Sequence, residues 1–328
     1  MKFRGNFSSS ALSAGPSSKR SGPSLLRNSL RIAVAGVALS MAAACASEPE
    51  TIADEAEDIP SEFTVPVPGL EISLVEPGAE PRQTLAPSLS VGDSHSTVVT
   101  VRSELFQQLG DDPESDFGLP PVTLPLDTEV EAADGGEWSV ALTLGRPESP
   151  DNVVNSALAA AEGSSAGMTI RADGSVSELR ISPNAESSDI ARSAVEQALF
   201  QAVYGMIAFP QEPVGEGAQW TIDQPIESQM EIVQRTTVTV REMSGTTLLL
   251  DLAVEQRPRL PYLDVPGEGR VAVDEFTGEG TGSLRVDLER PLPTEGGFEM
   301  YGTQQYSDPD TGYVVRQRTS MATEWDSP

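Results

Sequence analysis

Closely spaced β-type runs are the feature that most restricts how this chain can fold. Seven runs of alternating or β-branched residues begin at residue 219, separated by segments rich in turn formers. Alternation is plainest in Thr236–Val240 and Leu284–Leu288. Consecutive strands this close together can pair only antiparallel, because a parallel crossover needs about a dozen residues or more. The sequence therefore predicts a meandering antiparallel sheet from residues 219–223, 229–243, 246–256, 270–275, 282–289, 297–306 and 313–323.

Further strands are expected before residue 187. Residues 96–105 alternate and form the first strand of the predicted domain. Two hairpins follow, each closed by Asp and Gly residues, which tolerate the positive φ of tight turns. For residues 72–75 two alternatives stay open, namely one additional short strand or part of an irregular segment. The hairpins comprise 127–133 with 137–144, closed by Ala133–Gly136, and 168–172 with 176–181, closed by Asp173 and Gly174.

A long helix is predicted over residues 187–209. Its apolar residues recur every three or four positions and leave one polar face. Ser187 or Ser188 caps the start, and Pro210 ends the helix because proline restricts the residue before it. With a short Ala-rich helix at 152–161, the predicted fold class is α+β, an antiparallel sheet packed on one long and one short helix. The apolar stripe contains Ile190, Ala191, Ala194, Val195, Ala198, Leu199, Ala202, Val203 and Met206.

Residues 1–44 have the organisation of a signal peptide. They carry six basic and no acidic residues, and an apolar run of small residues from 32 to 44 ends at Cys45. This run is shorter than the roughly 20 apolar residues of a membrane span. Ser18–Ser21 lacks paired arginines, so we expect the general secretion route rather than the twin-arginine route.

Cys45 is the only cysteine in the chain. Together with Ala42–Ala44, it resembles the lipobox of bacterial lipoproteins, although Ala42 stands where leucine is more usual. This resemblance covers about the first 45 residues, and it implies that Cys45 is acylated, becomes the new amino terminus and holds the protein at the membrane. Two other interpretations stay open, namely ordinary cleavage after Ala42–Ala44 and an uncleaved anchor.

Residues 45–90 are predicted to be an acidic, proline-rich tether, followed by an α+β envelope domain over residues 91–328. Removal of the leader takes away six of the 21 basic residues and none of the 50 acidic ones, which leaves 15 against 50 and a formal charge of −35. A surface of this sign repels nucleic acid and anionic lipid headgroups. We therefore expect no nucleic-acid partner, and contact with the membrane only through the lipid on Cys45.

The segment Phe209–Trp220 reads Phe-Pro-x-x-Pro-Val-Gly-x-Gly-Ala-x-Trp. It resembles a segment of uncharacterised bacterial envelope lipoproteins, a family without a known activity. We expect Gly215 and Gly217 to turn the chain sharply, and Trp220 to be the first buried residue of the next strand. The turn at Asp308–Tyr313 is similar to a hairpin of lipoprotein carriers that hold acyl chains between a curved sheet and a helix.

The sequence offers few groups for catalysis or metal binding. His95 is the only histidine, and no Gly-x-Ser-x-Gly motif marks a nucleophile, so we interpret His95 as an exposed loop residue. A zinc site would lack soft ligands. Asp308 and Asp310 flank a turn that lacks the glutamate of an EF-hand loop, which favours a plain hairpin. Residues 278–282 lack the lysine of a phosphate loop and are interpreted as a flexible hairpin loop. No cofactor or metal is expected.

These observations favour a non-enzymatic, membrane-anchored envelope lipoprotein whose extracytoplasmic domain binds a ligand or a partner. The alternative is a carrier of lipid or another hydrophobic ligand, held in a cavity between the sheet and the helix by Leu199, Val203 and Met206. An enzyme is a third hypothesis, disfavoured because no catalytic constellation is recognisable. The sequence does not identify the protein or lipid ligand.

Overall fold

One antiparallel sheet forms most of the protein. The structure, a computed structural model, describes residues 62–226, 230–265 and 269–328. Within these residues 15 strands pair, and every pairing is antiparallel, which confirms the predicted sheet. The strands are β1 (Phe63–Pro66), β2 (Glu71–Glu76), β3 (Ser94–Leu109), β4 (Ser115–Asp116), β5 (Leu119–Asp134), β6 (Glu137–Leu144), β7 (Ser165–Arg171), β8 (Val176–Ser182), β9 (Gln219–Ile226), β10 (Ile232–Ser244), β11 (Thr247–Pro258), β12 (Tyr262–Val265), β13 (Gly269–Asp287), β14 (Glu295–Ser307) and β15 (Val314–Asp326).

The predicted α+β class with one long helix is wrong. Strands make up 58% of the structure and helices 10%. Helix α1 (Asn152–Leu158) has 7 residues and continues into a 3₁₀ turn at Ala159–Ala161, in the place of the expected short helix. Helix α2 (Asp189–Tyr204) has 16 residues and is capped by Ser188, whose hydroxyl accepts a hydrogen bond from the N–H of Ala191.

Helix α2 ends at Tyr204 and not at residue 209. Backbone groups of the residues that follow form hydrogen bonds with partners outside the helix. The N–H of Phe209 donates to the carbonyl of Asp173 at 2.7 Å, and the carbonyl of Ala208 accepts a hydrogen bond from the indole of Trp220 at 2.9 Å. Gly205, the residue after the helix, lies so close to Trp325 that a Cβ would collide with the indole ring. Residues 206–209 therefore run along the core without helical structure, and Pro210 does not set the end of the helix.

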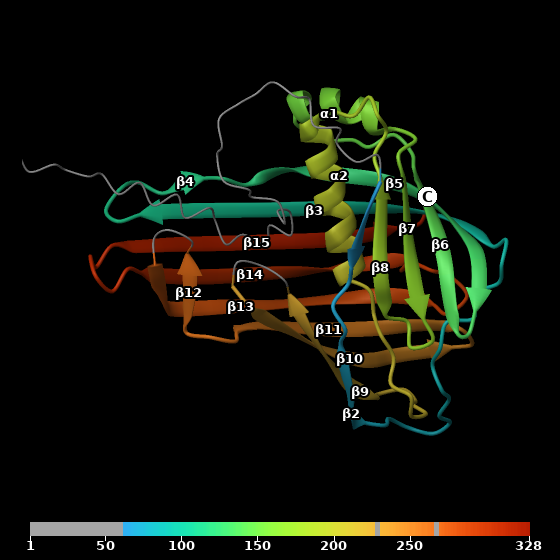
Figure 1. Cartoon of the computed structure of the whole chain (residues 1–328). Coiled ribbons are helices and arrows are strands. Elements are labelled where there is room, and N and C mark those ends of the chain that lie inside the picture. Colours follow the sequence, from blue (N-terminus) through green and yellow to red (C-terminus); the bar gives the residue numbers. More distant parts are fainter. Residues whose placement is uncertain (1–61, 227–229, 266–268) are drawn as a thin grey trace, which may run out of the picture. The chain divides into compact units, whose positions relative to one another are not determined.

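The sheet curls around α2. Its strands follow the order β1-β8-β7-β6-β5-β3-β15-β14-β13-β11-β10-β9-β2, with β12 added beside β13 and β4 beside β3. In Figure 1, β6, β7 and β8 run steeply across the direction of β15, β14 and β13. Leu179 of β8, Leu199 of α2, Trp220 of β9 and Trp325 of β15 belong to one buried core, so both halves of the sheet face the helix. We call the side of the sheet that faces α2 its inner face.

The two edge strands, β1 and β2, follow each other directly in the chain. β1 pairs with β8 at one edge, β2 pairs with β9 at the other, and residues 67–70 join them. Val67 is buried, and its N–H donates to the carbonyl of Ser177 at 2.9 Å. These strands lie inside the predicted tether of residues 45–90, so the sheet begins before residue 91. Residues 45–61, including Cys45, and the whole leader lie outside the described residues.

Residues 278–282 are not a flexible hairpin loop, because they lie within β13, the longest strand. That strand also joins the two runs predicted at 270–275 and 282–289. A Cβ on Gly280 or Gly282 would collide with backbone atoms of β14. Glycine is needed here because the neighbouring strand approaches closely, which is one of its regular uses within strands.

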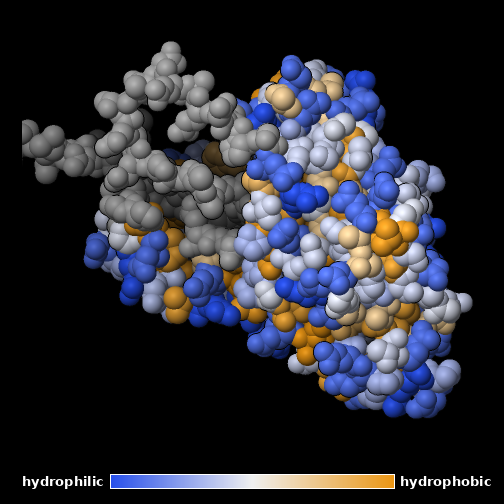
Figure 2. Space-filling view, turned by 45° about the vertical axis from the view of Figure 1, so that its right-hand side comes forward, coloured by the Kyte–Doolittle hydropathy of each residue, from blue (hydrophilic) through white to orange (hydrophobic). Residues whose placement is uncertain are grey.

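The outer face of the sheet is polar. Along β14, exposed Glu299, Tyr301 and Thr303 alternate with the buried positions Met300 and Gln304. Figure 2 shows that hydrophilic residues cover most of the visible surface, with hydrophobic residues in small patches between them. Of the helices in the described part of the chain, none has the length and apolar character needed to cross a membrane.

Candidate ligand site on the inner face

The three residues predicted to face a ligand cavity lie in a filled part of the interior. Leu199 and Val203 are buried, and Met206 packs half-buried against the same core. The cavity beside Leu199 measures about 10 Å³, and the one beside Met206 about 30 Å³. Small-molecule pockets measure roughly 300–1,000 Å³, so side chains occupy the space between α2 and the sheet.

His95 lies in strand β3 and not in an exposed loop. It pairs with Thr128 of β5, whose hydroxyl donates to the carbonyl of His95 at 3.1 Å. The residue is half-buried, and within the described structure its Nε2 has no hydrogen-bond partner. The strand begins at Ser94, two residues before the predicted start, because the ladder with β5 extends that far.

Asp308 uses its carboxylate to hold the turn between β14 and β15. It accepts hydrogen bonds from the hydroxyl of Thr311 at 2.6 Å and from the N–H of Asp310 at 2.8 Å. These bonds lower the pKa of Asp308, the hydroxyl of Thr311 contributing most. Over the ranges that the structure describes, no group of three His, Cys, Asp or Glu residues could hold a metal ion.

A band of buried glutamines crosses the inner face at the end of the strands remote from α2. Gln304 lies six residues along β14 from Phe298, the residue against which the end of α2 packs. All members of the band are between 1% and 8% exposed. We call this set the glutamine band: Gln107 of β3, Gln234 of β10, Gln256 of β11, Gln304 of β14 and Gln317 of β15.

The strand register brings these glutamines together. Gln234 is paired with Gln256, and Gln317 lies between Gln304 and Gln107 on its two neighbouring strands. Directly paired residues project on the same face with Cβ atoms about 5 Å apart. Strand β13 interrupts the row with Gly278, which pairs with Gly302 of β14.

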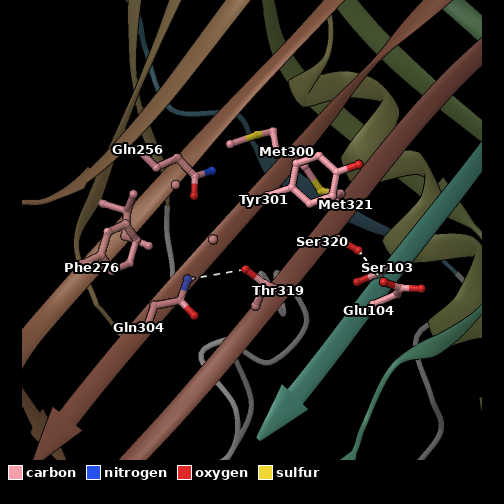
Figure 3. Close-up of a pocket in the computed structure, with 13 residues that line it drawn as sticks. Ser103, Glu104, Gln256, Phe276, Met300, Tyr301, Gln304, Thr319, Ser320 and Met321 are labelled. Atoms are coloured by element: carbon pink, nitrogen blue, oxygen red, sulfur yellow. Dashed lines mark hydrogen bonds between the residues drawn. The ribbon is translucent and has the colours of Figure 1, made fainter.

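Three amide nitrogens of the band donate hydrogen bonds. Nε2 of Gln256 donates to Oε1 of Gln234 at 2.9 Å, and Nε2 of Gln317 donates to Oε1 of Gln107 at 2.8 Å. Nε2 of Gln304 donates to the hydroxyl of Thr319 at 3.4 Å, as the dashed line in Figure 3 marks. Each of these three nitrogens thus makes one hydrogen bond and keeps a second N–H.

Two amide oxygens of the band are buried without a partner. Oε1 of Gln304 and Oε1 of Gln317 accept no hydrogen bond from the described residues, and the hydroxyl of Tyr306 is likewise unpaired. A buried polar atom left unpaired costs about 1–3 kcal/mol, so such atoms in a folded protein call for an explanation. Burial also raises the pKa of Tyr306, because it penalises the charged phenolate.

A small hollow lies beside Gln304. Its volume is about 40 Å³, enough for a water molecule or one polar group of a larger molecule. The pair Gly278 and Gly302 contributes no side chain to it. Figure 3 shows lining residues from β3, β11, β13, β14 and β15. Its polar lining includes Gln256, Gln304 and Thr319, and its apolar lining consists of Ile232, Phe276, Met300 and Met321.

The lining of the hollow is almost free of charge. Glu104 is the one charged residue among the described residues that line it, and its carboxylate accepts a hydrogen bond from the hydroxyl of Ser320 at 2.8 Å. No arginine, lysine or histidine stands in this set. A phosphate or carboxylate would therefore meet acceptor oxygens without a cation to balance its charge.

A larger, open groove of about 1,010 Å³ crosses β10, β11, β13, β14 and β15, and its lining includes several carboxylates of the outer face. Several of these carboxylates already have partners. Asp251 pairs with Arg241, Glu295 with Arg285 at 3.2 Å and Glu324 with Arg102 at 2.7 Å. Because acidic residues predominate over the whole chain, the acidity of this groove does not indicate a ligand.

Comparisons with known proteins show no family for this chain. It matches no protein-family model and no curated protein. A similar solved structure is that of an outer membrane channel from Pseudomonas putida F1, with a TM-score of 0.18, 8% identity and coverage of 73% of this chain and 97% of that chain. A likeness this weak carries no argument about fold or function. The resemblance of Phe209–Trp220 to envelope lipoproteins therefore stays a prediction.

Sequence reasoning missed the glutamine band, although a signal was present. In β11, Gln256 continues the period-two series of Leu250, Leu252 and Val254, which all point inward. In β14, Gln304 likewise continues the series of alternate, buried positions that contains Met300 and Gly302. Glutamines in the apolar phase of several neighbouring strands indicate a buried polar row, but only the register shows that they meet.

Proposed function

We propose that this protein is a non-enzymatic extracytoplasmic lipoprotein, held at the membrane by an acylated Cys45, whose curled sheet binds a ligand at the glutamine band. The observation that carries the ligand-binding part is the buried, unpartnered oxygen of Gln304, which lines the hollow at Gly278 and Gly302, together with that of Gln317, its paired neighbour on β15. Binding would supply the missing hydrogen bonds, so the cost of burying these oxygens would be recovered in the complex.

The alternative of a carrier that holds lipid between α2 and the sheet has less support. The cavities beside Leu199 and Met206 measure about 10 and 30 Å³. An acyl chain there would have to displace well-packed core side chains, and each displaced side chain costs free energy. The hollow beside Gln304, at about 40 Å³, is of similar size, so the feature that favours the glutamine band is its unpaired buried oxygens.

Native mass spectrometry of the protein purified from its own host tests the ligand. We expect a noncovalent adduct above the mass of the acylated chain, and we expect Gln304→Leu to lose it. The matched control is Gln305→Leu on the same strand, because Oε1 of Gln305 accepts from Arg316 at 3.1 Å instead of lying in the band. A protein without any adduct, or an adduct that both variants retain, would contradict ligand binding at the band.

The anchor has a separate test. Cys45→Ala should abolish incorporation of radioactive palmitate and release the protein from membranes into the soluble fraction, because no other thiol is available for acylation. Ser47→Ala, two residues further on, is the control and should stay labelled. Continued palmitate labelling of Cys45→Ala would refute the anchor and leave the ligand site untouched.

A further inference from the structure

We propose that the glutamine band recognises a neutral, hydroxyl-bearing group, and that the ligand carries an apolar part against the neighbouring methionines and Phe276. This inference rests on the proposed function and specifies the chemistry of its ligand. The same hydroxyl-bearing group could belong to the headgroup of a lipid or to a free sugar.

The first step concerns hydrogen-bond polarity. The nitrogens of Gln256, Gln304 and Gln317 already donate, to Gln234, Thr319 and Gln107 respectively. Each of these NH2 groups keeps a second N–H, whereas the two atoms of the band that have no partner at all are acceptor oxygens, on Gln304 and Gln317. An acceptor is satisfied only by an N–H or O–H donor, so the ligand must supply donors.

The second step concerns charge. An anion brings acceptors and no donors, and the hollow has no cationic side chain among its described lining residues. A cation would bring donors, but its burial needs a charged partner, and Glu104 is exposed and lies in register with Ser320 and Tyr301 on the outer face of the sheet. A hydroxyl group supplies donors and carries no charge, so it fits both observations.

The third step concerns the apolar lining. Met300 is buried and Met321 half-buried, and both line the hollow together with Phe276 and Ile232. Methionine side chains adapt their shape readily, so they can move to admit an aliphatic chain. The hollow of about 40 Å³ admits a single polar group, and the remaining ligand would lie along these side chains.

Titration calorimetry with four probes tests the assignment. Three probes share an octyl chain and differ in the charge of the head group, and the fourth is the sugar head group without the chain. These are octyl glucoside below its micelle concentration, octanoate, octylammonium and glucose. Octyl glucoside should bind most tightly, at least about tenfold tighter than either charged octyl compound, since one hydrogen bond to a buried partner is worth roughly that factor. If glucose binds as tightly as octyl glucoside, the hydroxyl assignment stands and a free sugar is the source, but the apolar part of the proposed ligand is refuted.

Variants locate the binding. Gln304→Leu should weaken octyl glucoside at least about tenfold, while Gln305→Leu should leave it unchanged. Should the leucine variant fail to fold, Gln304→Met preserves the length of the side chain and replaces it.

Tighter binding of octanoate or octylammonium, no binding of octyl glucoside, or full binding by the Gln304 variant would overturn the assignment. If a charged probe binds tightest and Gln304→Leu still weakens it, the ligand class is wrong but the proposed site survives. Absence of any native adduct would instead contradict the proposed function itself.

Discussion

Single atoms determine how closely backbone segments of this protein approach each other. A Cβ on Gly215 would collide with the carbonyl oxygen of Ala79, and Gly217 has a φ of +77°. Trp220 is fully buried at the start of β9. The sequence predicted the turning role of both glycines and the burial of Trp220, because glycine and aromatic residues have few other uses in such a segment. It could not indicate Ala79 as the neighbour of Gly215.

We expect Gly215→Ala to lower the free energy of unfolding by about 2–4 kcal/mol, because the backbone of residues 79–81 would have to move. Urea unfolding of the purified domain measures this change. Gly69→Ala is the control, since no atom lies within 4 Å of a Cβ at that position, and it should stay within about 0.5 kcal/mol of the parent. Equal stabilities of the two variants would disprove the close approach at Gly215.

Tyr306 gives a pH-dependent prediction. Its buried hydroxyl has no partner in the described structure, and burial raises its pKa. The unfolded phenol ionises near pH 10 while the folded phenol stays neutral, so the parent should lose stability as the pH rises above about 10. Tyr306→Phe should lose this part of the alkaline decline, and at pH 7 it should be as stable as the parent or about 1 kcal/mol more stable.

Urea unfolding at a series of pH values from 7 upward tests this expectation. Tyr313→Phe is the control, because Tyr313 is only half-buried and lies in the turn before β15. An unchanged alkaline decline in Tyr306→Phe, or a large loss of its stability at pH 7, would show that the hydroxyl is bonded in the folded protein.

Individual elements were predictable from the sequence where period and turn residues agree. The hairpin of β7 and β8 and the short helix α1 lie where expected, because Asp173, Gly174 and the capping Asp151 act locally. The end of α2 and the continuity of β13 were not predictable. The first depends on long-range bonds to Asp173 and Trp220, and the second on the close approach of β14 to Gly280 and Gly282.

At the scale of elements, β1 and β2 protect the two edges of the sheet. Ile72 and Leu74 of β2 and Phe63 and Val65 of β1 pack against the core. A chain that begins at residue 77 should therefore lose at least about 3 kcal/mol of unfolding free energy, since these four side chains, Leu70 and the buried Val67 are all removed. It should also associate, because unpaired edges of β8 and β9 become exposed.

Urea unfolding and size-exclusion chromatography test both expectations. The control is a chain that begins at residue 62, which retains every strand of the sheet. A chain from residue 77 that remains monomeric and as stable as this control would show that the two strands are dispensable.

The whole molecule carries far more acidic than basic residues. Many arginines are paired with carboxylates across the outer face, for example Arg235 with Asp223 and Arg318 with Glu114, both at 2.6 Å. Exposed pairs of this kind contribute little, typically up to about 1 kcal/mol each. Repulsion among the remaining carboxylates should outweigh them.

We therefore expect stability to rise with ionic strength. Between about 0.01 and 0.1 M sodium chloride the screening length falls from about 30 to about 10 Å, which weakens repulsion between separated carboxylates. The urea midpoint of the domain at pH 7 should increase over this range. A midpoint that falls with added salt would mean that the ion pairs dominate.

The central claim is that the buried oxygens of the glutamine band accept hydrogen bonds from a ligand. Carbon-13 NMR of the protein labelled at the glutamine side-chain carbonyl observes these groups directly, with Gln304→Leu, Gln317→Leu and Gln305→Leu identifying the resonances. On titration with octyl glucoside, the resonances of Gln304 and Gln317 should shift downfield and that of Gln305 should stay in place. Unmoved resonances of Gln304 and Gln317 at saturating octyl glucoside would contradict the account.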